Sequence, residues 1–324
     1  MSQGQHAKLL LMGKAGAGKT SMKSIIFANY HARDTRVLHQ TNFIEHSSLR
    51  FMGNLKLNLW DCGGQDQFME NYFESQRETI FQNVEVLIYV LAAVSDKSEK
   101  RDREGRVGKS EMSKELEYFR HAMESLLQLS PNAKVFCLIH KVDLVQADKR
   151  KEAISNFERE LGQAAQGMSL TCYATTIWDE SLFKAWSEIV RSLIPDICML
   201  RAQVNHFCDV CKADEVVLFE KNTFLLIENC ARKPAADPHR FEKISNIVKQ
   251  FKLSCGKVNT QFRSFKFQHP QFTATIQPFL DHSFVMIVTS DPHVKQAAVS
   301  ANLSAARRHF RAITKAGAAF GVHL

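Results

Sequence analysis

The sequence predicts a two-domain protein, with an α/β domain over residues 1–195 and an α+β domain over residues 196–324. Two observations predict this. Before Pro195, apolar strand-like runs alternate with longer segments of helical periodicity, which indicates βαβ units and a mostly parallel, doubly wound sheet. After Pro195, a helix, adjacent strands, a second helix, further strands and a last helix follow each other. The length of 324 residues agrees with roughly two domains.

The elements of the first domain follow from short apolar or alternating runs. We expect strands at Lys8–Met12, Ser48–Met52, Leu55–Trp60, Val84–Val90, Lys134–His140 and Ser169–Thr175, and helices at Thr20–Tyr30 and Glu180–Leu193. The first, fourth and fifth strands are nearly continuous hydrophobics, as parallel strands covered on both faces should be. The third alternates between apolar and polar residues, which predicts one less buried face.

The elements of the second domain follow a different pattern. We expect helices at Met199–Cys211, at Phe241–Phe251 and from about Val294, a hairpin of Glu215–Glu220 with Thr223–Cys230, and strands at Phe272–Leu280 and Ser283–Ser290. The hairpin is indicated by Lys221-Asn222 between two strand-like runs.

Residues 96–117 fit neither pattern. This polar insert carries seven acidic and seven basic residues and two glycines, so it can bury little. We expect a solvated loop that merges into a helix containing Leu116 and Phe119. A lineage-specific insertion and an error in the gene model both account for such a segment.

Composition excludes several classes of protein. Hydrophobic residues make up 45% of the chain and charged residues 23%, which argues against disorder. The apolar stretch Val86–Val94 is too short to cross a bilayer, and we find no signal peptide or lipidation motif. We therefore expect a cytoplasmic protein that reaches a membrane only indirectly. The net charge of +8 is dispersed, so we expect no nucleic-acid partner.

A phosphate-binding motif follows the first strand. The pattern G-x-x-x-x-G-K-[ST] is formed by Gly13, Lys14, Ala15, Gly16, Ala17, Gly18, Lys19 and Thr20, and Ser21 comes next. The glycines let backbone N–H groups point at phosphate oxygens, and the following helix adds its positive end. We expect Lys19 to bridge the β- and γ-phosphates and the Thr20 hydroxyl to bind Mg²⁺.

Two further motifs favour a GTPase over an ATPase or an ATP-dependent kinase. Asp61 to Gln65 matches D-x-x-G-Q, in which Asp61 holds an Mg²⁺-bound water, the Gly64 N–H meets the γ-phosphate and Gln65 orients the attacking water. His140-Lys141-Val142-Asp143 stands where a Ras-like GTPase has N-K-x-D.

The second of these motifs would recognise the base. The Asp143 carboxylate can accept hydrogen bonds from N1–H and N2 of guanine, which adenine does not offer. Lys141 would cover the face of the base with its aliphatic stem. His140 departs from the asparagine of N-K-x-D, because a neutral imidazole donates once and accepts once.

Long runs of the sequence resemble the Rag/Gtr small GTPases, in particular the RagA/RagB-like branch, which itself has His-Lys at positions 140 and 141. The resemblance covers nearly the whole chain, and the runs that carry it are 21–30, 57–66, 69–73, 176–180, 241–255 and 290–292. It implies a Ras-like P-loop GTPase domain followed by a roadblock/longin-like dimerisation domain. It also assigns Thr41 as the switch threonine, catalytic together with Gln65 and a ligand of Mg²⁺, and places Thr176 and Ile177 among the nucleotide-binding residues.

The resemblance further implies a function. The chain would bind GTP or GDP with Mg²⁺, hydrolyse GTP slowly, and depend on a GTPase-activating protein. It would pair through its C-terminal domain with a RagC/RagD-like GTPase. A scaffold would hold the heterodimer on the cytosolic face of the lysosome or vacuole, where it signals amino-acid sufficiency to the TOR kinase complex.

The residues around Thr41 depart from the family pattern. The family has glycine and alanine before this threonine and isoleucine and aspartate after it, whereas this chain has His39, Gln40, Asn42 and Phe43. A bulky His39 would oppose a positive φ at a glycine position. An alternative function is therefore a nucleotide-loaded scaffold subunit that neither hydrolyses GTP nor switches efficiently.

Overall fold

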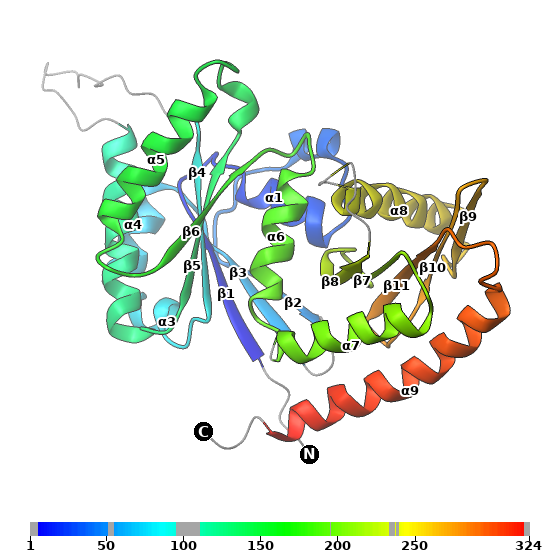
Figure 1. Cartoon of the computed structure of the whole chain (residues 1–324). Helices are drawn as coiled ribbons and strands as arrows, with labels where there is room; N and C mark the ends of the chain where they lie inside the picture. Colours follow the sequence, from blue (N-terminus) through cyan, green and yellow to red (C-terminus); the bar gives the residue numbers. More distant parts are fainter. Residues whose placement is uncertain are drawn as a thin grey trace, which may run out of the picture. The chain divides into compact units, whose positions relative to one another are not determined.

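The computed structural model describes residues 6–50, 55–94, 111–194, 196–232, 237 and 240–320 (Figure 1). The chain divides into two compact units, and each is described by itself. The first unit contains residues 7–49 and 57–185, and the second is built mainly from Trp186 and the residues that follow it. Pro195 and residues 95–110 of the polar insert lie outside the described residues.

The first unit is built on a six-stranded sheet in the order β2-β3-β1-β4-β5-β6. Its strands are β1 (His6–Met12), β2 (Glu45–Arg50), β3 (Lys56–Asp61), β4 (Val86–Ala92), β5 (Lys134–His140) and β6 (Leu170–Thr175). β4 pairs in parallel with β1 and with β5, and β5 pairs in parallel with β6. The predicted α/β class with a mostly parallel sheet is confirmed.

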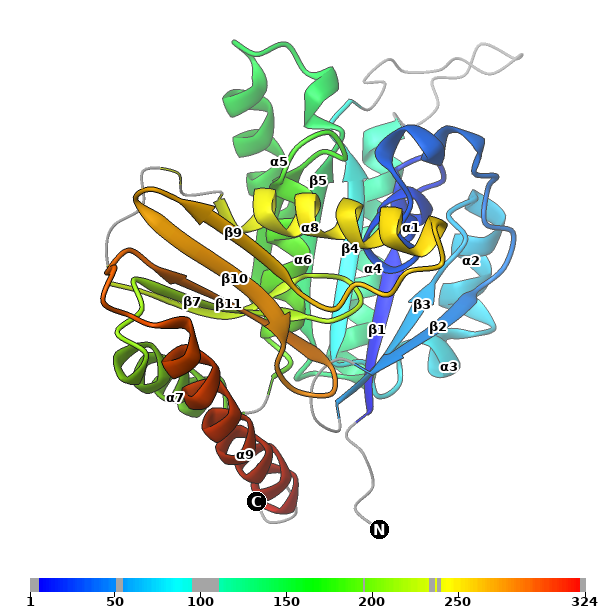
Figure 2. The same ribbon diagram turned by 90° about the vertical axis from the view of Figure 1, so that its right-hand side faces the viewer.

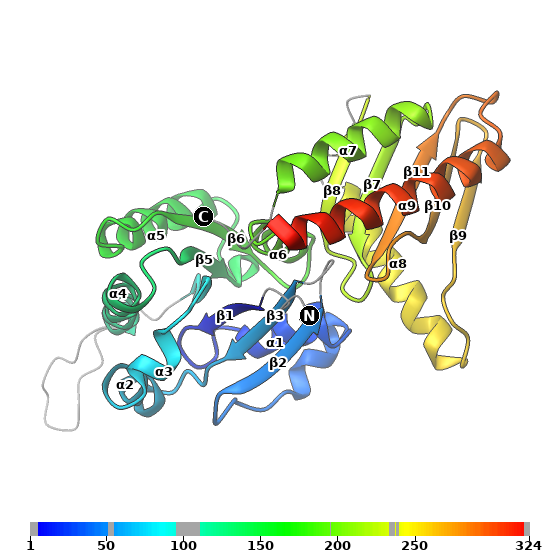
Figure 3. The same ribbon diagram turned by 90° about the horizontal axis from the view of Figure 1, so that it is seen from below.

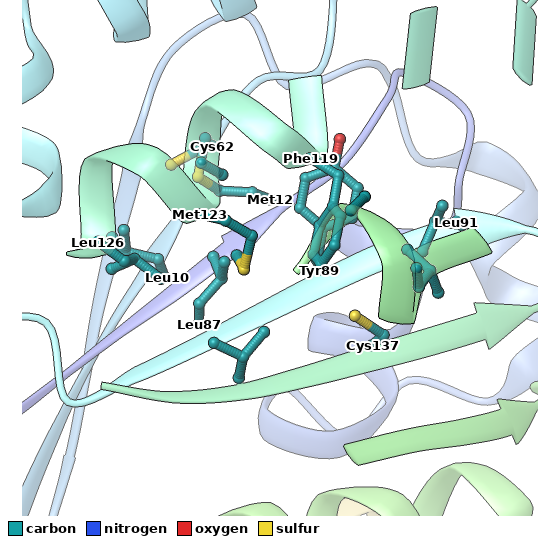
Figure 4. Close-up of a cluster of buried hydrophobic side chains, with 14 of the residues drawn as sticks. Leu10, Met12, Cys62, Leu87, Tyr89, Leu91, Phe119, Met123, Leu126 and Cys137 are labelled. Atoms are coloured by element: carbon teal, nitrogen blue, oxygen red, sulfur yellow. The ribbon is translucent and has the colours of Figure 1, made fainter. Parts of the chain in front are cut away.

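Helices cover both faces of this sheet. They are α1 (Lys19–Phe27), α2 (Asp66–Glu74), α3 (Arg77–Phe81), α4 (Glu111–Leu129), α5 (Arg150–Ala164) and α6 (Ser181–Arg191), with short 3₁₀ turns at Ala32–Val37 and Val142–Leu144. Alternate residues of β1, β4 and β5 pack against α2 to α5 in one cluster, in which the Tyr89 and Phe119 rings lie 5.0 Å apart (Figure 4). The buried residues of α1 are not part of that cluster, because α1 lies on the opposite face (Figure 3).

The carboxyl ends of four strands supply the functional motifs. β1 runs into the phosphate loop, β3 ends at Asp61, β5 ends at His140 and β6 ends at Thr175. The register pairs His140 with Thr175, so these strand ends lie at the same level. This edge of an open parallel sheet is where ligands bind in α/β folds.

The second unit is built on a five-stranded antiparallel sheet in the order β8-β7-β11-β10-β9. Its elements are α7 (Ile197–Val210), β7 (Glu215–Glu220), β8 (Leu226–Ala231), α8 (Arg240–Lys257), β9 (Phe265–His269), β10 (Phe272–Pro278), β11 (Ser283–Thr289) and α9 (Gln296–Phe320). α8 packs on one face through Val248, and α7 and α9 lie on the other, where Phe207 and Phe310 contact Phe279 (Figure 2). The predicted antiparallel α+β domain is confirmed.

Three local differences from the predicted elements have physical reasons. β8 begins at Leu226, three residues later than expected, because the Glu220 carboxylate accepts hydrogen bonds from the Asn222 and Thr223 N–H groups and widens the turn. β9 was not predicted as a strand, because its exposed sequence FKFQH lacks a buried apolar run.

The third difference concerns the insert. Its last seven residues, 111–117, belong to helix α4, so the predicted merging into a helix with Leu116 and Phe119 is confirmed. The prediction of a solvated segment is wrong for Glu115, which is buried. Within the described residues, no helix combines the length and the apolar character needed to cross a bilayer.

Candidate functional site

The phosphate loop has the backbone shape that its glycines were expected to allow. It joins β1 to α1, and φ is positive at Gly13, Gly16 and Gly18. Gly18 has a φ of 105°, and a Cβ atom there would lie 2.6 Å from Cδ2 of His140. No larger residue fits at this position without moving His140. The loop and the β5 end are therefore in contact through this glycine.

Lys19 lies buried beneath the loop. Its Nζ donates hydrogen bonds to the carbonyl oxygens of Gly13, at 2.6 Å, and Lys14, at 3.0 Å. Burial lowers the pKa of the ammonium, and the charge of nearby Asp61 opposes this shift. These hydrogen bonds hold the Lys19 ammonium inside the loop that is predicted to bind phosphate.

Three predicted metal ligands are brought together from three segments of the chain. The hydroxyl oxygens of Thr20 and Thr41 are 2.7 Å apart, and the Thr20 hydroxyl donates to Oδ2 of Asp61 at 3.4 Å. Asp61 is fully buried, and its Oδ1 has no hydrogen-bond partner among the described residues. An unsatisfied carboxylate oxygen beside two hydroxyl groups is a hard-oxygen donor set that fits Mg²⁺.

Lys23 also belongs to this cluster, although it was not predicted. Its Nζ lies 2.8 Å from Oδ2 of Asp61 and forms an ion pair with Glu45 of β2. Both hydrogen bonds raise the pKa of Lys23 against the opposing effect of burial. The sequence spacing could have indicated this position, because Lys23 follows Thr20 by three residues and both therefore lie on one face of α1.

The D-x-x-G-Q segment lies against the phosphate loop. The Gly64 carbonyl accepts a 2.7 Å hydrogen bond from the Ala15 N–H. A Cβ atom on Gly64 would lie 2.4 Å from the Ala15 nitrogen, so only glycine allows this approach. Gln65 follows at the start of α2, and its buried Oε1 has no partner among the described residues.

The segment before β2 brings Thr41 into the site despite its unusual neighbours. Thr41 is buried, whereas Phe43 is 75% exposed with its ring centroid 6.3 Å from that of Phe68. Nε2 of Gln65 donates to Oδ1 of Asn42 at 3.4 Å. His39 does not adopt a positive φ.

The predicted base-binding residues meet at the ends of β5 and β6. Nδ1 of His140 lies 2.9 Å from Oγ1 of Thr175, and burial lowers the His140 pKa to about 4. Lys141, with a φ of 62°, donates from Nζ to the Gly16 carbonyl at 2.6 Å. The Thr176 hydroxyl donates to Oδ1 of Asp143 at 2.5 Å, which orients that exposed carboxylate.

The remaining predicted residues are placed as follows. Ser21 lies in the first turn of α1, and Ala17 is buried in the loop. Ile177 is half-buried and follows Thr176. Thr175 was missed, because its role in contacting His140 depends on the β5–β6 register rather than on a motif.

Comparisons with known proteins identify similar chains. A family model described as the Gtr1/RagA G protein conserved region matches residues 8–248. Ras-related GTP-binding protein A of Dictyostelium discoideum is 49% identical over 303 residues, which are 94% of this chain and 96% of that protein. GTP-binding protein gtr1 of Schizosaccharomyces pombe is 48% identical over 307 residues, 94% of this chain and 95% of that protein.

Other relatives extend the comparison. Ras-related GTP-binding protein B of Rattus norvegicus is 46% identical over 336 residues, covering 95% of this chain and 86% of that protein. Ras-related GTP-binding protein C of Mus musculus is more distant, at 27% identity over 222 residues, 66% of this chain and 50% of that protein.

Proposed function

Because the chain belongs to the Gtr1/RagA family of G proteins, a family of GTPases, we propose that it is a slow GTPase and a guanine-nucleotide-dependent switch. One observation carries the proposal. The residues proposed to bind phosphate, Mg²⁺, the attacking water and the base come from separate motifs, and they meet at one edge of the sheet. Hydrogen bonds join the phosphate-binding motif to Thr41, Gly64 and Lys141. A chance motif would not be expected to bring its partners together in this way.

Each group has a role in the proposed reaction. Asp143, held by Thr176, accepts from N1–H and N2 of guanine, and Lys19 and the loop amides bind the phosphates. Thr20, Thr41 and Asp61 would hold Mg²⁺, which neutralises charge on the phosphates. The amide of Gln65 orients the attacking water. His140 stays neutral at physiological pH, because its pKa is about 4.

The same contacts suggest how the nucleotide state is sensed. The Ala15 N–H donates to the Gly64 carbonyl. A γ-phosphate that accepts from the loop amides competes for this donor and would displace the segment containing Gly64. Thr41 is tied to Thr20 of the loop, so both switch segments respond to the same phosphate.

Hydrolysis is proposed to be slow without help. Isolated Ras-type enzymes turn over at about 10⁻⁴ s⁻¹, and an arginine supplied by an activating protein raises the rate strongly. In single-turnover assays with GTP, the Gln65→Leu variant should bind GTP as the parent chain does, with hydrolysis slowed at least tenfold, because leucine cannot orient water. A matched Gln67→Leu variant changes an exposed position of α2, two residues after Gln65, and should hydrolyse GTP at the parent rate. Equal turnover in all three proteins would overturn the proposal.

A second candidate function is a nucleotide-loaded scaffold that does not switch. It is favoured by Asn42, which accepts from the Gln65 amide, and by the exposed Phe43. Trypsin cleavage between Arg33 and Arg50 separates the two functions. A switch is protected in this region only by a non-hydrolysable GTP analogue, whereas a scaffold gives the same pattern with GDP.

We further propose that the second unit pairs with a RagC/RagD-like GTPase. The existence of relatives named Ras-related GTP-binding protein C supports such a partner. A scaffold would hold the pair on the cytosolic face of the lysosome or vacuole, where it signals to the TOR kinase complex. These last steps rest on the family alone.

A further inference from the structure

Glu115 of α4 is a buried acid that the proposed mechanism does not use. Its side chain is 3% exposed, and one carboxylate oxygen accepts a hydrogen bond from the backbone N–H of Lys14 in the phosphate loop. Its Oε1 has no hydrogen-bond partner among the described residues. A buried glutamate with an unpaired carboxylate oxygen is costly, so its presence beside a binding loop needs an explanation.

The helix that carries Glu115 packs against β4. The Tyr89 hydroxyl of β4 donates to the Glu115 carbonyl oxygen at 3.2 Å, and the Tyr89 ring packs edge-on against Phe119 of the same helix. Tyr89 and Phe119 are both fully buried. The Glu115 carboxylate therefore projects from a helix that is packed against the buried Tyr89.

We infer that Glu115 is a positioning residue for the phosphate loop: its carboxylate fixes the Lys14 peptide and thereby the loop amides that follow it. Lys14 is followed by Ala15, whose N–H donates to the Gly64 carbonyl. Gly16 comes next, and its carbonyl accepts from Lys141. Fixing Lys14 therefore fixes the part of the loop that joins the D-x-x-G-Q segment and the base-binding segment.

The charges around Glu115 link this role to pH. Lys14 and Lys19 face it from the loop and α1, and Tyr89 faces it from β4. Burial raises the Glu115 pKa to about 7, against the opposing effect of the two lysines, so both protonation states are populated at neutral pH. Phosphate anions in the loop disfavour the ionised carboxylate and raise this pKa further.

A group whose pKa is higher in the bound state takes up a proton on binding, so nucleotide affinity is greatest at low pH and falls as pH rises through about 7. This inference rests on the proposed guanine-nucleotide site.

The test is the dissociation rate of fluorescent GDP from the full-length chain with Mg²⁺, between pH 6 and pH 8. Glu115→Leu removes both the charge and the acceptor, whereas Glu115→Gln removes only the charge. Glu115→Leu should therefore release GDP at least about tenfold faster than Glu115→Gln, because the buried Lys14 N–H is left without an acceptor. Glu115→Gln keeps an acceptor oxygen without the titrating charge. It should release GDP with a weaker pH dependence than the parent chain, whose release should accelerate as pH rises.

Glu117→Gln is the matched control. Glu117 lies on the same helix but lines a separate groove of about 620 Å³ with residues of α2 and α3. Its rate and pH profile should equal those of the parent chain. The parent chain and all variants are assayed with the same nucleotide, so titration of the GDP phosphate cancels in the comparison.

The outcomes are distinguishable. Equal release from Glu115→Leu and Glu115→Gln, or identical pH profiles for Glu115→Gln and the parent chain, would overturn this inference alone. If Glu115→Leu does not fold, the pH profile of Glu115→Gln decides. A parent chain that binds no GDP would contradict the proposed function itself, and this inference with it.

Discussion

Lys23 sets the charge balance of the proposed metal site. Its ammonium lies 2.8 Å from the fully buried Asp61 carboxylate, on the same oxygen that accepts from Thr20. A buried carboxylate that loses its ion-pair partner is strongly destabilising. The chain thus carries a cation of its own beside the oxygen atoms that would bind Mg²⁺.

Replacing Lys23 should make the fold dependent on Mg²⁺. In EDTA, Lys23→Met should lower the free energy of unfolding by about 3 kcal/mol, because Asp61 loses its ion pair. With Mg²⁺ and GDP present, the bound cation replaces the ammonium and most of the loss should disappear. Urea denaturation under both conditions measures the difference, with Lys23→Arg as a charge-preserving control. An equal loss with and without Mg²⁺ would contradict this role.

His140 predicts a specific pH dependence of stability. Its folded pKa of about 4 lies below the usual value of 6.5, because the ring is buried and lies near Lys141. The unfolded chain therefore binds a proton more readily between these values, and folding loses stability as pH falls from 6.5 towards 4. At pH 5 the loss relative to pH 7 is about 2 kcal/mol.

A His140→Asn variant isolates this contribution. Urea denaturation at pH 7 and pH 5 should show a smaller pH-dependent loss of stability in the variant than in the parent chain, because asparagine does not titrate. His309→Asn, at an exposed position of α9 in the second unit, is a control that should keep the parent difference. The account of His140 is contradicted if both variants lose stability equally.

Motif residues could be predicted from sequence because their spacing alone defines their chemistry. Lys19, Asp61, Gln65 and Asp143 needed only the local pattern. Glu115 could not be predicted in this way, because its contact with Lys14 depends on how α4 packs beneath the loop. Its signal was weak: a glutamate between Met112 and Phe119, on the apolar face of a helix in a polar segment.

At the scale of elements, α8 and β9 form the surface best suited to the proposed pairing. On α8, Ile247 is 66% exposed and lies on the same face as the partly exposed Phe251. β9 is an edge strand of its sheet and exposes Phe267. An open strand edge beside exposed apolar side chains is a template for pairing with another chain.

A charge on this surface should prevent pairing without unfolding the chain. Ile247→Asp should abolish co-purification of a co-expressed RagC-like partner, because an aspartate would be buried unpaired in the interface. Val210→Asp, on α7 at the opposite face of the sheet, is the control and should leave pairing intact, since Val210 is similarly exposed at 49%. Circular dichroism checks that both variants fold. Undiminished pairing by Ile247→Asp would exclude this surface.

A strong pattern of apolar residues made most helices and strands predictable, and a weak pattern explains why β9 and the start of α4 were not predicted. Continuous apolar runs predicted β5 to the residue, and β1 and β4 to within two residues at each end. β9 was not predicted because an exposed edge strand has no buried face, so its apolar and polar residues need not alternate. The start of α4 escaped because charged residues surround its few inward-facing positions.

At the scale of the whole molecule, the two units divide the proposed work. The first holds the phosphate, metal and base residues at the carboxyl edge of its parallel sheet, and the second offers an open strand edge and an apolar helix face. The net charge of +8 has no part in this account. Residence at the lysosome or vacuole would depend on partners.

The central claim is that the chain binds guanine nucleotide. The most direct test is to purify the full-length protein from cells, denature it and identify the nucleotide released by chromatography. The account predicts GDP or GTP in equimolar amount with the chain, because Asp143 is oriented to read guanine and Lys19 is buried in a phosphate loop. Release of ATP or ADP, or of no nucleotide, would contradict it.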